Sequence, residues 1–120
     1  MIAKIVGILV IMLTLDSIYI SLNYSFFRNL YQSVQGSPLI IRMTGAVICY
    51  AILTGLLYYF IVLPRRSVFD AFLLGVGVYG VYDSTNYATL KSWSLKMMVM
   101  DTLWGGILFA TTTGLLRFIA

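Results

Sequence analysis

The sequence has no histidine, no glutamate, one cysteine and two prolines among its 120 residues. Without histidine or glutamate, hydrolytic acid–base catalysis loses its usual groups and is disfavoured. The single thiol, Cys49, cannot form an intrachain disulfide. Because it lies within an apolar run, we expect it to be buried and unreactive.

Charge is also scarce: 10% of the residues are charged and 61% are hydrophobic. Soluble domains carry about 25% charged residues, and small ones bury the least of their surface. Most of this chain therefore has lipid as its solvent. The net charge of +4 does not indicate nucleic-acid binding, because the basic residues stand at the ends of apolar runs, as in membrane proteins.

Four apolar segments, about 4–24, 39–63, 68–89 and 97–118, are long enough to cross a hydrocarbon core of ~30 Å. The first is expected to be a retained helix, since no small-residue cleavage site follows it. Residues 25–36 show amphipathic helical spacing. The predicted fold is all-α: a single integral membrane domain, residues 1–120, with four transmembrane helices and a short interfacial helix.

Four spans would place both termini on the side of the Arg65–Arg66 turn. The basic residues divide evenly: that side carries Lys4, Arg65, Arg66 and Arg117, and the other carries Arg28, Arg42, Lys91 and Lys96. The free amino terminus and the compact arginine pair favour termini in the cytoplasm.

Gly75, Gly77 and Gly80 spell G-x-G-x-x-G. A dinucleotide-binding loop needs a preceding strand, whereas these glycines lie within the third apolar segment. Helical spacing instead places small residues on one stripe, where a neighbouring backbone can approach closely. The residues predicted for helix packing are Gly77, Gly80, Ser84 and, in the last segment, Gly105. The opposite stripe, with Gly75 and Tyr79, is expected to face polar partners.

Asp16, Asp83 and Asp101 lie inside apolar segments. A carboxylate at the bilayer centre costs on the order of 2.5–3.5 kcal/mol. With ~1.5 Å rise per residue and alternating helix directions, all three fall roughly 6–12 Å from the same membrane face. We expect them to share one polar site inside the bundle. Its candidate residues are Asp16, Tyr19, Asn23, Arg42, Tyr79, Tyr82, Asp83, Thr85, Asn86, Asp101 and Trp104.

Two interpretations of this site stay open. It could be a structural network in which aspartates pair with Arg42 and with tyrosine or asparagine side chains. It could instead be a functional pocket: a cation or lipid-headgroup site, or a proton relay. No closely spaced carboxylates indicate a metal site, and no cofactor or catalytic residue is predicted.

The runs "YGVYDSTNYATLKSW" and "MDTLWGG" resemble a family of small predicted membrane proteins of unknown function from bacteria and some large DNA viruses. Its hallmarks fall on Asp16, on Tyr82, Asp83, Thr85 and Asn86, and on Asp101, Trp104 and Gly105. The resemblance spans essentially the whole chain. It implies a four-helix membrane protein and carries no established chemistry.

The first functional hypothesis is a non-enzymatic structural or interaction component of a membrane assembly. Its partners would be the bilayer and other membrane proteins or its own copies. The alternative is a transporter-like or ligand- or cation-binding protein that uses the aspartate cluster. A lipid-modifying membrane enzyme is the third.

Overall fold

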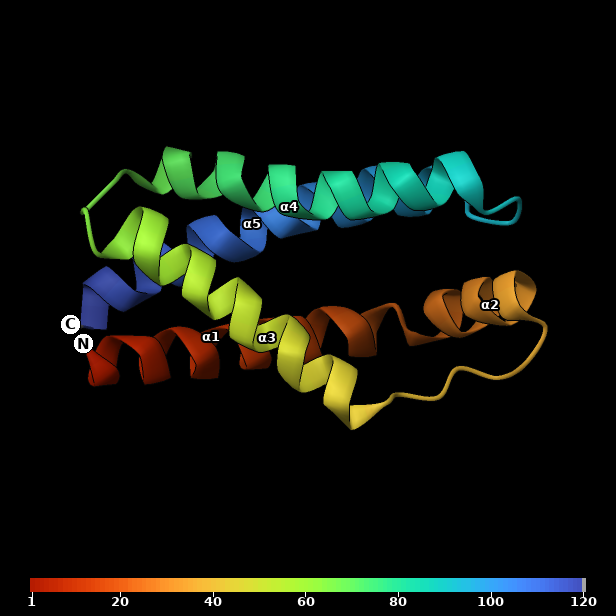
Figure 1. The fold of residues 1–120 in the computed structure, drawn as a ribbon, viewed down its shortest axis with the longest axis horizontal. Coiled ribbons are helices and arrows are strands. Elements are labelled where there is room, and N and C mark those ends of the chain that lie inside the picture. The colour runs from red at the N-terminus through yellow and green to blue at the C-terminus, as the bar shows by residue number, and fades with distance from the viewer. Residues whose placement is uncertain (120) are drawn as a thin grey trace.

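The computed structural model describes residues 1–119, so Ala120, the last residue of the predicted domain, lies outside them. Within residues 1–119 the chain forms five α-helices and no strand (Figure 1): α1 (Ile2–Leu22), α2 (Tyr24–Gln35), α3 (Met43–Leu57), α4 (Val68–Thr89) and α5 (Leu95–Ile119). A π-helical segment, η1 (Tyr58–Val62), continues α3. The predicted all-α class is confirmed.

Three helical stretches in residues 1–119 are long and apolar enough to cross a membrane: α1, α3 with η1 (Met43–Val62), and α5. Four were predicted. The remaining segment, α4, has 22 residues and matches the predicted bounds 68–89. Its glycines and polar residues, among them Asp83 and Asn86, make α4 less hydrophobic than the three candidate spans. Many large apolar side chains point outward, as in Val10, Ile52 and Leu103.

The start of the second apolar segment differs from the prediction. Pro38 does not open a helix, and α3 begins only at Met43. Gly36 ends α2 in the left-handed conformation, with φ of 73°. The Gln35 side chain then donates to the carbonyls of Ser37 and Pro38, at 3.1 and 2.9 Å. These contacts hold the chain outside helical geometry while it returns from α2 to the bundle.

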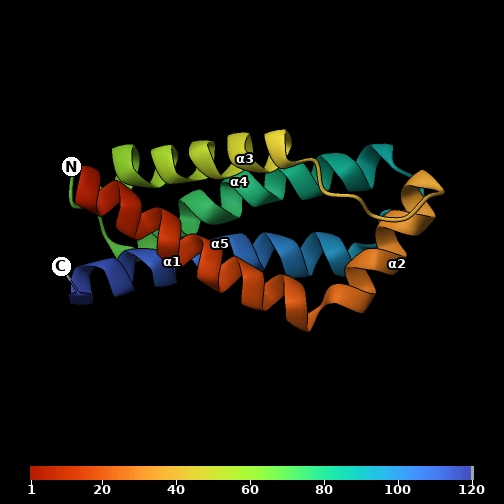
Figure 2. The same ribbon diagram turned by 90° about the horizontal axis from the view of Figure 1, so that it is seen from below.

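The helical hairpin of α4 and α5 is the most extensively packed helix pair, and the other helices pack around it. The two helices run antiparallel side by side, α1 crosses α5 at an angle (Figure 2), and α3 runs obliquely across the bundle (Figure 1). Both termini lie at one end of the molecule. The short helix α2 lies at the other end, beside the turn between α4 and α5.

The backbones of α4 and α5 meet where Gly75 faces Gly105. A Cβ added to Gly75 would overlap the Gly105 carbonyl, and one added to Gly105 would overlap the Tyr79 ring. At Gly80 a Cβ would lie 3.3 Å from the Thr102 methyl group. Because small residues permit this approach, Gly75, Gly105 and Gly80 are packing positions.

The predicted small-residue stripe is only in part the packing face of α4, because Gly80 and, on α5, Gly105 lie at the helix contact whereas Gly77 and Ser84 do not. A Cβ at Gly77 would have no heavy atom within 4 Å, and Ser84 is exposed. The helix instead turns Gly75, Tyr79 and Asp83 toward α5. The polar face and the close-packing face are therefore one and the same.

The apolar interior has two parts. The larger cluster includes Ile8, Leu57, Leu108 and Phe109, near the end with the termini. The smaller cluster, Phe27, Leu30, Trp93 and Met97, joins α2 to the turn before α5 and the start of α5. Cys49 belongs to neither, because its side chain is exposed on α3. The expectation that this thiol is buried was wrong.

We expect Gly75→Ala to destabilise the protein by about 1–3 kcal/mol, the usual cost of overpacking, because its Cβ would collide with the Gly105 backbone. Gly77→Ala, on the open face of the same helix, is the matched control and should leave stability unchanged or slightly raised. The free energy of unfolding in mixed micelles measures both. Equal effects would contradict the close approach of α4 and α5.

Candidate functional site

Asp16 joins three helices. It lies on α1 and is 7% exposed. Its carboxylate accepts hydrogen bonds from the Tyr50 hydroxyl of α3 and, at 2.9 Å, from the Trp104 indole N–H of α5. Hydrogen bonds to a carboxylate are stronger than those between neutral groups. This buried acid therefore fixes how α1, α3 and α5 stand relative to one another.

Asp101, on α5, is bound in a similar way. It accepts a hydrogen bond of 3.0 Å from the Tyr19 hydroxyl of α1. The rings of Tyr19 and Trp104 are stacked, with centroids 4.4 Å apart and planes 7° from parallel. Each ring donates to a different aspartate, so the stacked pair connects the Asp16 and Asp101 carboxylates across the α1–α5 contact.

Asp83, on α4, differs from both. Its side chain is completely buried and faces the Asp101 carboxyl and the Trp93 indole. Neither carboxyl oxygen of Asp83 meets hydrogen-bond geometry, and the same holds for the Trp93 indole nitrogen. A buried polar group without a partner is unfavourable. Asp83 is thus the one acid of the three without a hydrogen bond of good geometry, although the Asp101 carboxyl and the Trp93 N–H lie close to it.

Aromatic side chains enclose Trp93 at the α2 end of the molecule. Tyr31 and Tyr82 present ring edges to it, with centroids 5.6 and 6.0 Å away. Their hydroxyls lie 3.2 Å apart and share a hydrogen bond. Burial, with the hydrogen bond to Tyr82, raises the pKa of the Tyr31 phenol, so this group on α2 stays neutral. The two tyrosine rings cover Trp93, which lies beside Asp83.

We call Asp16, Tyr19, Tyr50, Asp83, Trp93, Asp101 and Trp104 the acidic network. It lies between the two apolar clusters, because Tyr50 and Trp104 pack on the larger one and Tyr19 on the smaller. In the described part of the chain, the one ion pair joins Arg66 and Asp70 outside the network, at 3.1 Å. No described group of three or more histidine, cysteine or acidic residues could hold a metal ion.

The structure places the predicted site residues unevenly. Five lie in the acidic network: Asp16, Tyr19, Asp83, Asp101 and Trp104. Tyr79 packs over Gly105 beside them, and Tyr82 lies at the Trp93 edge.

Four predicted residues lie outside the network. Arg42 is exposed and pairs with no aspartate, so its predicted role as counter-ion is wrong. The Asn23 side chain donates a hydrogen bond of 2.9 Å to the Tyr19 carbonyl and so stabilises the C-terminal end of α1. Thr85 is exposed, and Asn86 is half-buried without a side-chain bond to the aspartates.

Two members of the network were missed. Tyr50 was overlooked, although a hydroxyl in the middle of an apolar segment is itself a signal, because it needs a hydrogen-bond partner there. Trp93 lies in the turn between the last two apolar segments and was not among the candidates, whereas it is 3% exposed and lies beside Asp83. Sequence spacing alone gave no indication that this turn folds back over the bundle.

Comparison with protein families gives one match: the model described as Predicted membrane protein (DUF2177) covers residues 1–118. No curated protein matches the chain, and no solved structure matches it.

We expect Tyr19→Phe to destabilise the protein by about 1–2 kcal/mol, because the buried Asp101 carboxylate would lose a donor. Tyr59→Phe is the control, since Tyr59 is 63% exposed. The free energy of unfolding in micelles compares the two variants. A Tyr19→Phe protein as stable as the control would contradict the observed hydrogen bond.

Proposed function

The chain belongs to the family of predicted membrane proteins whose model covers residues 1–118, and we propose that it is a transporter-like protein with an exchangeable proton. The proton is held by the carboxyl pair Asp83–Asp101, within a bundle of four spans. This proposal favours the functional interpretation of the buried aspartates over the structural one.

In this proposal α4 is the fourth span. It has 22 residues, and at ~1.5 Å per residue that length crosses the hydrocarbon core. It packs along α5, which is itself apolar enough to span. Its polar side chain Asp83 is buried against α5, while Leu73 and Val81 are exposed. A helix paired this closely with a spanning helix shares its depth.

The observation that carries the proposal is the unpartnered Asp83 carboxyl. A structural network satisfies all of its buried polar groups, because each one left over costs stability. Asp83 is fully buried, makes no hydrogen bond of good geometry, and has a second carboxyl, that of Asp101, as a close neighbour. Two adjacent carboxylates cannot both remain ionised without a cation. A shared proton is the simplest partner for this pair, and one that can leave.

The remaining groups suit proton exchange. Asp101 already has the Tyr19 hydroxyl as donor, so it carries the negative charge when Asp83 holds the proton. On the outer side stand Trp93 and the hydrogen-bonded hydroxyls of Tyr31 and Tyr82. Tyr82 is 50% exposed. In this proposal the proton therefore leaves the Asp83–Asp101 pair toward the end of the molecule that carries α2.

A structural or interaction component of a membrane assembly is the second candidate. One observation favours it: Gly77, Ser84 and Leu73 form an open stripe on α4 that no helix of this chain covers. Small residues on such a face allow another helix to approach. In that case the aspartates would only brace the bundle, and the partner would be a second membrane protein or another copy.

Topology tests the four-span arrangement. Reporter fusions at the amino and carboxyl termini should both report the cytoplasm, and a fusion in the 91–94 turn should report the opposite side. If α4 did not cross the membrane, the two termini would lie on opposite sides. Termini that share the outer side would keep the four spans and reverse the orientation.

Asp83→Asn tests the proton site. In wild-type protein, infrared difference spectroscopy should show the carbonyl stretch of a protonated carboxyl group, which Asp83→Asn should remove. The melting temperature should change little, because an asparagine amide of similar size can donate to Asp101 in place of the shared proton. Asp70→Asn, which alters an acid outside the network, is the control and should keep the band. An unchanged band with a large loss of stability would favour the structural candidate.

A further inference from the structure

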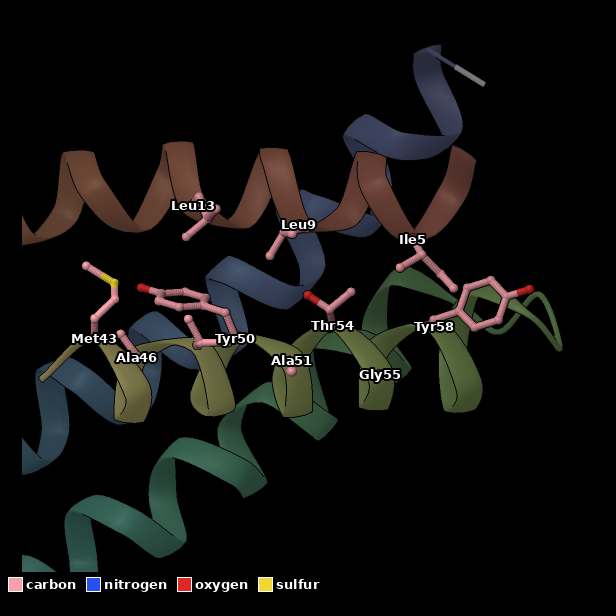
Figure 3. A pocket seen from close by; sticks show the side chains of 11 residues that line it. Ile5, Leu9, Leu13, Met43, Ala46, Tyr50, Ala51, Thr54, Gly55 and Tyr58 are labelled. Carbon is pink, nitrogen blue, oxygen red and sulfur yellow. The ribbon is translucent and has the colours of Figure 1, made fainter. Parts of the chain in front are cut away.

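An apolar groove runs between α1 and α3 on the outer surface of the bundle (Figure 3). Its volume is about 600 Å³. Ile5, Leu9 and Leu13 line it from α1, and the small residues Ala51 and Gly55 leave room on α3. Leu13 is 40% exposed, so the groove opens sideways to the surroundings of the helices. In a membrane, molecules dissolved in lipid can enter it directly.

A carboxyl group lies just behind this apolar wall. The α1 positions Ile5, Leu9 and Leu13 lie on one helical stripe, and Asp16, three residues further on, continues it. Tyr50 lines the groove, and its hydroxyl donates to Asp16. A single aromatic side chain therefore separates the groove from a buried acid. Rotation of Tyr50 would open the carboxylate to a molecule in the groove.

We propose that the groove binds a lipophilic organic cation dissolved in the membrane, with Asp16 as its counter-ion. This inference rests on the proposed transporter-like function and names its class of substrate. The apolar part of the molecule lies between α1 and α3. Its positive centre replaces the Tyr50 hydroxyl at the Asp16 carboxylate.

The charge of the residues around the groove favours a positively charged ligand. No residue that lines the groove is charged. Tyr50 from α3 donates to Asp16, and the other titratable groups near enough to interact with it electrostatically are Tyr19, Cys49, Tyr79 and Asp101. None is basic, so nothing in the site neutralises an ionised Asp16. An anion would be repelled, and a neutral acyl chain would make no use of the carboxylate.

The aromatic rings around Asp16 suit the same ligand. Trp104 and Tyr50 both contact the carboxylate, and Tyr19 is stacked on Trp104. The faces of tryptophan and tyrosine attract cations, most strongly where water is excluded. The carboxylate and its rings would bind the positive centre of a lipophilic cation, and the apolar groove would bind its apolar part.

Tetraphenylphosphonium is a suitable probe, and tetraphenylborate, of similar size and opposite charge, is its control. Equilibrium dialysis of the full chain in mild detergent should show saturable binding of the phosphonium and none of the borate. Asp16→Asn should weaken phosphonium binding by roughly tenfold or more, the scale of one lost charge pair.

Filling the groove provides a second test that keeps Asp16 intact. Gly55 and Gly45 both lie on α3 with open space at the Cβ position, but only Gly55 lines the groove. Gly55→Leu should abolish phosphonium binding, and Gly45→Leu should leave it unchanged. Equal binding by these two variants, or wild-type affinity in Asp16→Asn, would overturn the inference. The carboxyl infrared band of Asp83 would survive that result, so the proposed proton site would stand or fall separately.

Discussion

A carboxylate surrounded by hydrocarbon has to find its hydrogen-bond donors within the protein, and this requirement organises the bundle. Here the donors are aromatic and come from other helices. Tyr50 and Trp104 bind Asp16, and Tyr19 binds Asp101. Rings of this kind bring a donor to the acid while their bodies pack against apolar neighbours. The same side chains therefore satisfy the acids and join the two apolar clusters.

The α4–α5 hairpin sets the position of the third acid. Close approach at Gly75 and Gly105 presses Tyr79 and Asp83 against α5. Asp83 is thereby buried beside Asp101 without gaining a donor. A buried carboxyl without a good donor costs stability, and a proton on one of the two acids would reduce that cost.

The three acids thus have different environments within one short chain. Asp101 and Asp83 face each other near the aromatic rings of the α2 end, whereas Asp16 adjoins a groove that opens to lipid. A proton site and a cation site connected by the stacked Tyr19–Trp104 pair would allow occupation of one to affect the other. That is the minimal arrangement for exchange of one ligand against another across a membrane.

The helical class followed from composition and periodicity. Regular helix rise and alternating direction predicted a similar depth for Asp16 and Asp101, and the stacked Tyr19–Trp104 pair connects these two acids. The pairing of Arg42 with a carboxylate could not be checked in this way. Arginine at a helix start can turn outward, and here the 37–42 segment carries it away from the aspartates.

What the sequence by itself determined is that the chain is helical, lies in lipid and carries acids inside its apolar segments, because composition and periodicity act locally. Only the tertiary structure decided which face of α4 meets α5 and which donors reach which acid. Spacing favoured the stripe with Gly77 as the packing face and the stripe with Gly75 as the polar one, whereas in the structure Gly75 meets α5. The choice depended on how the backbones of two helices fit together and on where Tyr50 arrives when α3 crosses the bundle, and such long-range geometry has no local signal.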